Sequence, residues 1–412
     1  MKPFIDTLEH ALQCCITKSE IYLEQIKPEI REYISRPDGQ YLQGKQEDYI
    51  PLRHIFAWTP SFFLGMGFWT YQVKKETKWL KWLHSFSNEY AAKVCHTPLE
   101  TMHDLGFLYS PYAVALYKAT NDSHMKKIAL QAAVVLAMRF VPNGSYIQAW
   151  GRMDHIIPGY VDQELAKNHF FTQSKGLAII DCMMNLPLLF WASEETNHPF
   201  YKNIAVAHAD ITLKYFFRED GSIYHAFRFH EETGQPIGGD NYCGYAIESH
   251  WARGTAWAIY GFISAFSYTG YERYLNAAVD LSLQFIAKSE DDGIPVWDFK
   301  LPQHQPAAAC GSKPWTDWDY TNPANKSRNR DTSAAAIAAS AFYEILKFKK
   351  EPAIQCAMDH ILMTLATKYT NYEPPIPGIL KEQNGQGVYT IFGDYFYMEA
   401  LCKKLYGFES IW

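Results

Sequence analysis

The chain repeats one pattern along its length: a segment that is apolar on all sides is followed by a segment with one polar face. HWARGTAWAIYGFISAF (250–266) is of the first kind and YERYLNAAVDLSLQFIAKS (271–289) is of the second. A helix without a polar face is buried, whereas a helix with a polar stripe lies at the surface. The alternation therefore predicts inner and outer helices that are connected as hairpins.

Twelve such segments predict an all-α fold, in which six inner–outer hairpins close into a double-layered ring, the (α/α)6 barrel. No stretch reads as a linker between domains, so residues 1–412 are expected to form one domain. The loops at one end of the inner helices would form the mouth of an active site. The expected helices are 3–25, 54–74, 79–95, 104–119, 123–139, 175–194, 198–217, 247–267, 271–288, 331–348, 351–368 and 391–405.

Three connectors, 141–174, 219–246 and 289–330, are too long for plain turns. Loops of that length often carry function. One of them contains SIYHAFRF (222–229) shortly before the turn-like EETGQP (231–236), which predicts a short strand and a turn.

The charge pattern and the missing motifs exclude several classes of function. A net charge of -6 without a basic stripe makes nucleic acid and membranes unexpected partners. No nucleotide fingerprint or zinc-ligand motif occurs, so neither a cofactor nor a metal is expected. The eight cysteines lack metal or redox spacing and are expected to be reduced thiols. Asp6 and Glu9 interrupt any signal-like stretch, which favours a cytoplasmic protein, or a periplasmic one if a leader was removed. A monomer and a homodimer both remain open.

Asp181 is the first candidate for a catalytic residue. It lies in GLAIIDCMMNLPLLFW (176–191), where Asn185 is the one strongly polar neighbour. Burial there would raise the pKa of the carboxyl group towards the range of a general acid. Alternatively, Asp181 pairs with an arginine of another helix or with a loop amide, as many buried carboxylates do.

Asp104 is the second candidate, in TMHDLGFLY (101–109) at the start of an expected helix. Asp is a favoured N-cap, and capping alone would explain it. Two carboxylates that open two inner helices would, however, face the same mouth. Paired carboxylates in a sugar cleft are a common arrangement for protonating one atom and activating water at another.

Arg253 lies between His250 and Trp257 at a spacing that places the three on one helix face. A cation beside an aromatic ring would suit a sugar that bears a carboxylate. The alternative is that Arg253 neutralises Asp181 or Asp104 in a structural pair.

Other residues have an ordinary structural explanation when taken alone. His225, in the expected strand, is ambiguous, and Trp58 and Trp150 are core residues by default. Asp331, before an Ala-rich helix, is expected to cap it, and Asp394 is expected to be a buried anchor that holds the last hairpin closed.

Taken together, these segments resemble the unsaturated glucuronyl hydrolases of glycoside hydrolase family 88. The resemblance follows the family's order over nearly the whole chain, and the Asp-x-Met-Met-Asn-Leu-Pro and Trp-Ala-Arg-Gly-x-Ala-Trp strings are specific. The matching pieces are HDLGF (103–107), IIDCMMNLPLLFWAS (179–193), GYAIESHWARGTAWAIYG (244–261), RDTSAAAIAASA (330–341) and GDYFYMEAL (393–401).

The resemblance implies an (α/α)6 barrel that removes an unsaturated (4,5-ene) glucuronic acid from the non-reducing end of lyase-generated glycosaminoglycan fragments. The reaction it implies is hydration of the C4=C5 vinyl ether, with Asp181 donating a proton to C4 and helping water add at C5. Asp104 matches the second carboxylate of the family. The positions that match substrate contacts are His103, Trp58, Trp150, His225, Arg253 and Trp257.

The chain also departs from the family pattern. Cys243 replaces a pocket glutamine, in Asn241-Tyr242-Cys243-Gly244, and Asn384-Gly385-Gln386-Gly387 replaces a lysine-containing sulfate motif. The segment from Gly151 to Ser174 looks long and could cover the cleft. Three alternatives remain: an unsaturated rhamnogalacturonyl hydrolase acting on pectin fragments, a non-catalytic carbohydrate-binding toroid, and a sugar epimerase.

Overall fold

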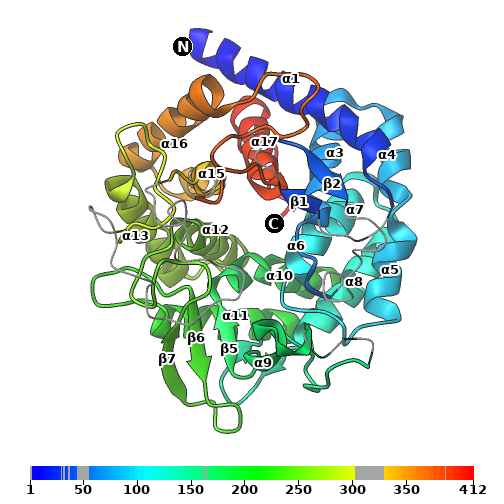
Figure 1. Cartoon of the computed structure of the whole chain (residues 1–412), viewed down its shortest axis with the longest axis vertical. Coiled ribbons are helices and arrows are strands. Elements are labelled where there is room, and N and C mark those ends of the chain that lie inside the picture. The colour runs from blue at the N-terminus through cyan, green and yellow to red at the C-terminus, as the bar shows by residue number, and fades with distance from the viewer. Residues whose placement is uncertain are drawn as a thin grey trace.

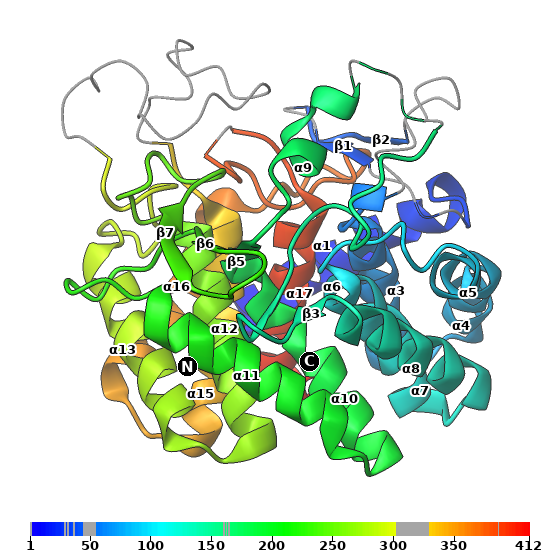
Figure 2. The same cartoon turned by 90° about the horizontal axis from the view of Figure 1, so that it is seen from below.

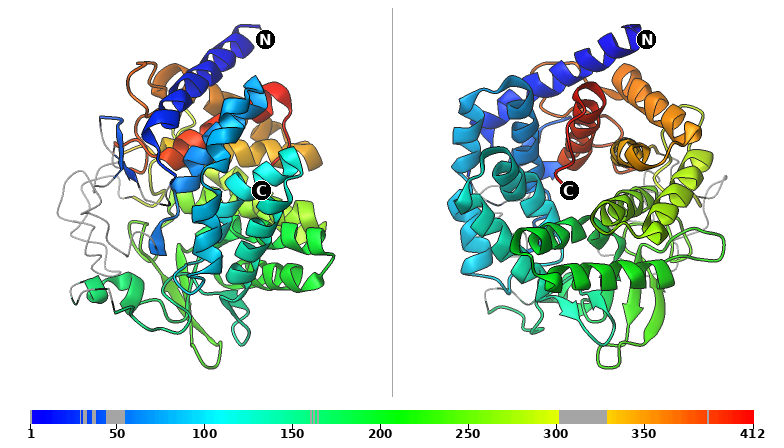
Figure 3. Two further views of the ribbon diagram at one scale, coloured as in Figure 1. Left: turned by 90° about the vertical axis from the view of Figure 1, so that its right-hand side faces the viewer. Right: turned by 180° about the vertical axis from the view of Figure 1, so that it is seen from behind.

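The protein is a closed ring of helices in two layers (Figure 1). The computed structural model describes residues 2–28, 30, 33–35, 38–43, 55–159, 161, 163, 165–301, 329–385 and 387–412. Seen from behind, the inner helices surround the centre of the molecule and the outer helices surround them (Figure 3). This arrangement confirms the predicted (α/α)6 barrel.

The inner layer consists of helices whose sequences are apolar on nearly every side. Each contacts the next around the ring, and α17 contacts α3, which closes it. In ring order the inner helices are α3 (Pro60–Lys74), α6 (Leu105–Tyr109) with its continuation α7 (Ala115–Thr120), α10 (Leu186–Thr196), α12 (Ala252–Thr269), α15 (Thr332–Phe348) and α17 (Ile391–Tyr406).

The outer layer consists of the helices that precede each inner helix in the chain. Because every outer helix returns the chain to the same end of the ring, all the inner helices run in one direction. The outer helices are α1 (Lys2–Gln25), α4 (Thr77–His84) with α5 (Ser87–Cys95), α8 (Ser123–Ala137), α11 (Pro199–Tyr215), α13 (Glu272–Lys288) and α16 (Pro352–Thr364). Among the described helices, none is both long and apolar enough to cross a membrane.

Short strands and one small helix lie at the end of the ring where the inner helices begin (Figure 2). β1 (Tyr33–Ser35) pairs with β2 (Tyr41–Gln43), β3 (Phe140–Val141) with β4 (Tyr146–Ile147), and helix α9 (His169–Thr172) lies above them. An antiparallel sheet has the order β5 (Leu177–Ile179), β6 (Ala226–Phe229) and β7 (Pro236–Asp240). The strand and turn expected in 222–236 are thus confirmed as β6 and the β6–β7 turn.

The helix expected over 175–194 is wrong in its first half. Gly176, at a φ of 65°, starts a strand instead, and the Leu-Ala-Ile run of β5 pairs with β6. A single 3₁₀ turn (Ile180–Met184) follows, and Pro187 lies in the first turn of α10. Asp181 therefore sits in a tight turn that leads into the inner helix, and not inside that helix.

Other boundaries differ for identifiable reasons. The segment 104–119 is interrupted by a π turn (Ser110–Val114), because Pro111 cannot donate an amide to a regular helix. The segment 79–95 breaks into α4 and α5, and 351–368 ends in a π turn (Leu365–Tyr369). The long helices expected from 54 and 247 begin at Pro60, after a break at 57–59, and at Ala252, because Trp251 forms a bridge with Asp298 instead.

Two structural residues act as expected. The Asp394 carboxylate accepts hydrogen bonds from the amides of Ile379 and Leu380, at 2.8 Å each, and from the Tyr41 hydroxyl at 2.6 Å. Asp331 caps α15 through the amides of Ser333 and its neighbour Ala334. The cysteines in the described part of the chain are free thiols, and Cys310 lies outside it.

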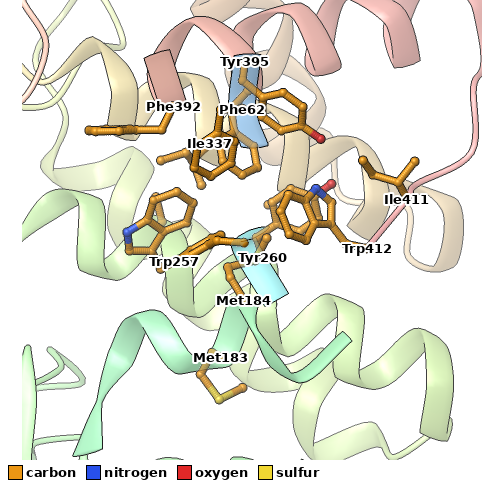
Figure 4. Packing of buried hydrophobic residues seen from close by; sticks show 14 of the residues in the cluster. Phe62, Met183, Met184, Trp257, Tyr260, Ile337, Phe392, Tyr395, Ile411 and Trp412 are labelled. Carbon is orange, nitrogen blue, oxygen red and sulfur yellow. The ribbon is translucent and has the colours of Figure 1, made fainter. Parts of the chain in front are cut away.

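The centre of the ring is filled by large side chains (Figure 4). Trp412 enters from the end opposite the mouth and stacks on Phe396 at 5.7 Å between ring centroids. Its indole nitrogen donates to the Glu399 carboxylate at 2.9 Å, and that carboxylate is also paired with the buried Lys403 at 3.0 Å. Trp412 further contacts Phe107 of α6 edge to face. Packed rings and a satisfied ion pair thus close the far end of the ring.

The Trp412→Ala variant is expected to lose about 3–5 kcal/mol of stability, because a large buried ring is removed and a carboxylate loses a donor. Urea unfolding followed by circular dichroism measures this loss. Trp412→Phe, which keeps the stacked ring and loses the donor, should fall between that variant and the wild type. Equal stability of all three proteins would contradict the closing role of Trp412.

Candidate active site

The predicted site residues gather where the inner helices begin. Trp58, just before α3, stacks on Phe392 in the first turn of α17, with centroids 5.1 Å apart. Arg253, in the first turn of α12, binds the cap residue of α15, Asp331, at 2.6 Å. Asn185, before α10, lies 3.4 Å from Asp104, the residue that precedes α6. These contacts join the starts of the inner helices at one end of the ring.

Asp181 has a carboxyl group whose pKa is strongly raised. Its side chain is 17% exposed, and its Oδ2 atom is buried with no hydrogen-bond partner among the described residues. Burial raises the pKa of its carboxyl group from 3.8 to about 7, and the nearby Arg253 guanidinium opposes this rise. The Oδ2 atom pairs with neither an arginine nor a loop amide, although a backbone hydrogen bond within Asp181 itself also opposes the rise in pKa. At neutral pH the group can therefore hold a proton and release it.

The turn that presents Asp181 is fixed by the sheet. The Ile180 amide donates to the backbone oxygen of His225 at 2.9 Å, which extends the β5–β6 pairing to the residue next to Asp181. Strand β6 begins directly after His225, so the same pairing brings the imidazole to the carboxylate. The His225 Nε2 atom lies 3.9 Å from Asp181 Oδ2.

His225 is held as a neutral hydrogen-bond donor. Its Nδ1 atom accepts from the amides of Tyr242, at 3.0 Å, and Cys243, at 3.4 Å. An imidazole nitrogen that accepts from an amide carries no proton, so the proton is on Nε2, the atom that faces Asp181. Burial lowers the pKa of His225 to about 3, and the Arg253 charge acts in the same direction.

Asp104 opens helix α6, as the sequence predicted, but its side chain makes no capping hydrogen bond there. Its Oδ2 atom instead lies 3.4 Å from Nε2 of His103, and its Oδ1 atom accepts from Asn185 at 3.4 Å. Burial lowers the pKa of His103 well below its usual range, and the positive charge of Arg139 acts in the same direction. Asp104 therefore faces a neutral imidazole and an amide inside the site.

Arg253 pairs with Asp331, a residue that was expected from the sequence only to cap a helix. Asp331 accepts from Nη1 of Arg253 at 2.6 Å and from the amide of Asn384 at 3.0 Å, besides capping α15. The Nε atom of Arg253 has no partner among the described residues, and the guanidinium lies over the Trp251 ring at 4.6 Å. The structural alternative, in which Arg253 pairs with Asp181 or Asp104, is wrong.

The expectation that His250 shares a helix face with Arg253 and Trp257 is also wrong, whereas the latter two lie four residues apart in α12. Helix α12 begins at Ala252, and His250 precedes it in a loop, with Nδ1 3.3 Å from Lys288 Nζ. His250 therefore lies outside helix α12 and faces Lys288 of α13.

The predicted tryptophans differ in how much surface they present. Trp58 is partly exposed, whereas Trp150 is buried and packs edge to face on Tyr242, at 4.5 Å between centroids. Trp257 is 0% exposed and packs on Phe107 at 5.0 Å, within the buried cluster that Figure 4 shows. Contact of these three rings with a sugar stays a prediction from the resemblance.

Two residues of this site carried no catalytic signal in the sequence. Arg139, at the end of α8, is 2% exposed and donates to backbone oxygens of the strand-like segment that holds Trp150 and to that of Thr101, two residues before His103. An arginine that follows a helix is ordinary, so nothing in the sequence marks it. Asn185 is the other. Its position as the one strongly polar residue near Asp181 in the sequence could have indicated a role in the site.

The departures from the family pattern fall partly within the described chain. Cys243 is partly exposed, and burial together with the Asp181 charge raises the pKa of its thiol to about 12. The site therefore has a neutral thiol close to the acid. Gln386 lies outside the described residues, and no group of potential metal ligands occurs among those described.

This arrangement brings together a protonated acid, a second carboxylate, a neutral imidazole donor and a guanidinium. Such a set can deliver one proton to a bound molecule while a cation holds a negatively charged group on it.

A family model described as Glycosyl Hydrolase Family 88 matches residues 32–291. The chain is 30% identical to an unsaturated glucuronyl hydrolase of Bacillus sp. (strain GL1), over 86% of this chain and 88% of that protein. It is also 30% identical to an unsaturated chondroitin disaccharide hydrolase of Streptococcus agalactiae serotype III (strain NEM316), over 86% of this chain and 83% of that protein.

The fold agrees with these matches. The crystal structure of an unsaturated glucuronyl hydrolase responsible for the degradation of glycosaminoglycan, from Bacillus sp. GL1, superposes with a TM-score of 0.79. The identity is 28%, and the match covers 97% of each chain. The resemblance indicated by the sequence strings is therefore confirmed.

His225 is expected to stay neutral, with its proton on Nε2, from about pH 4 upwards, because its pKa is about 3 and two amides occupy Nδ1. Long-range ¹H–¹⁵N correlation spectra of selectively labelled protein report both the tautomer and the titration. A titration near neutral pH, or a proton on Nδ1, would contradict this assignment.

Proposed function

The chain belongs to Glycosyl Hydrolase Family 88, and from this premise we propose that it removes an unsaturated (4,5-ene) glucuronic acid from the non-reducing end of lyase-generated glycosaminoglycan fragments. The observation that carries the proposal is the Asp181 carboxyl group. A pKa of about 7 keeps a proton available at neutral pH, and Oδ2 has no partner in the described chain.

In the proposed reaction the Asp181 carboxyl group protonates C4 of the unsaturated sugar, and positive charge develops at C5 and the ring oxygen. Water then adds to C5, and its proton returns to the Asp181 carboxylate. The hemiketal formed at C5 opens to a ketone, and the hemiacetal left at C1 releases the rest of the saccharide. One water is consumed, and the glycosidic oxygen is not the atom that Asp181 protonates.

The other groups support this sequence of steps. Asp104 shares the Nδ2 group of Asn185 with the backbone oxygen of Asp181, and its negative charge favours the oxocarbenium character at C5. Neutral His225 donates from Nε2 towards the same space. We assign Arg253 to the uronate carboxylate, because its guanidinium retains an unpartnered Nε–H group beside the acid.

Trp58, Trp150 and Trp257 are proposed to shape the sugar-binding walls, and His103 to hold Asp104. We propose that the chain works as one catalytic domain, as a monomer or a homodimer, with a saccharide as its partner and without a cofactor. The proposed compartment is the cytoplasm, in keeping with the free thiols of the described cysteines.

The purified protein is expected to bleach the near-ultraviolet absorbance of unsaturated disaccharides, because hydration destroys the conjugated alkene. A panel of chondroitin, hyaluronan and heparin disaccharides tests this, with an unsaturated rhamnogalacturonan disaccharide beside them. Unchanged absorbance across the glycosaminoglycan panel would contradict the proposal, and bleaching of the pectin-derived disaccharide alone would favour the alternative substrate.

The rate constant kcat/KM is expected to fall as the pH rises above about 7, by roughly tenfold per pH unit, because Asp181 must be protonated to act. Initial rates on one unsaturated disaccharide between pH 4 and 9 measure this fall in kcat/KM. An activity that stays level up to pH 9 would rule out Asp181 as the acid.

Asp181→Asn is expected to fold but to lose activity by several orders of magnitude, since an amide cannot supply the proton. It should also be more stable than the wild type at pH 8. Burial raises the pKa of Asp181 in the folded state, so the unfolded state releases this proton first as the pH rises from about 4 to 7. The wild type thereby loses on the order of 1–4 kcal/mol of stability, a loss that the amide avoids.

Thermal unfolding of both proteins at pH 4 and pH 8 measures the difference. The gain should be small at pH 4, because the Asp181 carboxyl group is then still partly protonated in the unfolded state as well as protonated in the folded state. A variant that is less stable than the wild type at both pH values would show that the carboxylate has a structural role.

A further inference from the structure

Asn185 contacts both acidic residues of the site with one side chain. It is fully buried between the 3₁₀ turn Ile180–Met184 and helix α10. Its Nδ2 atom donates to the backbone oxygen of Asp181 at 3.1 Å and to Oδ1 of Asp104 at 3.4 Å. One amide group thus joins the turn that presents the acid to the second carboxylate.

The oxygen atom of the same side chain also makes a specific contact. Asn185 Oδ1 accepts from the amide of Phe107 at 2.8 Å. Phe107 is the third residue of α6, and its amide is one that an N-cap side chain at Asp104 would normally bind. Asn185 therefore caps α6 from the neighbouring helix, and Asp104 is turned towards His103 and Asn185 instead.

The backbone is built to allow this approach. A Cβ atom added at Gly106 would lie 2.3 Å from the Cα atom of Asn185, so that no side chain fits between the two helix starts. Asn185 also makes no capping bond to its own helix α10, although it occupies the cap position. Its polar atoms are thus directed at α6 and at the Asp181 turn.

We propose that Asn185 is a positioning residue for the two carboxylates. By taking over the cap of α6, it leaves the Asp104 carboxylate to serve the site, and by bonding the Asp181 backbone it fixes the distance between the two acids. The proposal rests on the proposed function, in which Asp181 acts as the proton donor and Asp104 stays ionised.

Asn185→Asp is the sharpest variant, because it has the same shape and keeps an oxygen for the Phe107 amide. It loses the donor to Asp104 and puts a third carboxylate beside it. We expect kcat to fall by about 30-fold or more, with KM changed less than about threefold. The fall in rate at high pH, which reports the pKa of Asp181, should move up by about one pH unit, because neighbouring carboxylates resist joint ionisation.

Asn371→Asp is the matched control. Asn371 is also buried, and its Oδ1 atom accepts from a backbone amide, that of Glu373 at 3.0 Å, but it lies outside the site. This variant should keep the wild-type kcat and the wild-type pH at which the rate falls. A change of the same size in both variants would overturn the proposal. So would an Asn185→Asp protein whose kcat falls in step with its melting temperature while the fall in rate stays at the same pH.

Hydrogen exchange measured by mass spectrometry tests the cap without any activity. The start of α6 (residues 104–109) should stay protected in Asn185→Asp and lose protection in Asn185→Ala. If the wild type consumes no unsaturated disaccharide, the proposed function fails. The inference about Asn185 is then judged on exchange alone, and unchanged protection in Asn185→Ala would overturn it.

Discussion

The shared direction of the inner helices is the constraint on which the site depends. Each outer helix carries the chain back to the same end, so the inner helices all begin where Asp104, Asp181 and Arg253 lie. Helix starts expose unpaired amides and carry partial positive charge. An end of the ring made from several helix starts suits a substrate that bears a carboxylate. It also explains why acids, amides and hydroxyls gather there and why the opposite end is closed by packed rings.

The site keeps one acid protonated by pairing the nearest cation elsewhere. Arg253 would lower the pKa of Asp181 far more if the two were in direct contact. Asp331 prevents this contact, because it binds Arg253 at 2.6 Å and is itself held by the amides of the first turn of α15, which it caps. A capping residue and an ion pair thus set the acidity of a third group. The arrangement lowers stability at neutral pH, as catalytic sites often do.

The sequence alone predicted the ring, because alternating apolar and amphipathic segments leave few other ways to bury so many helices. It also singled out Asp181, since a carboxylate stands out in an apolar run, and Asp104, at the start of an expected helix; their catalytic roles stay predictions. It missed the turn that carries Asp181, because an apolar run before a proline reads equally well as helix or strand. It missed the roles of Asn185 and Asp331, since both depend on which helix starts lie side by side, a fact that no local pattern contains.

The seam between the first and last inner helices runs through the site. Trp58, before α3, stacks on Phe392, in the first turn of α17, and these two segments lie near opposite ends of the chain. During synthesis on the ribosome, the first five inner helices are made before α17, so this wall of the pocket is absent until translation is nearly complete. Contacts of such long sequence separation form slowly. The Trp58–Phe392 contact is therefore made only once the last inner helix has been synthesised, and the end of the ring that holds the acids is closed last.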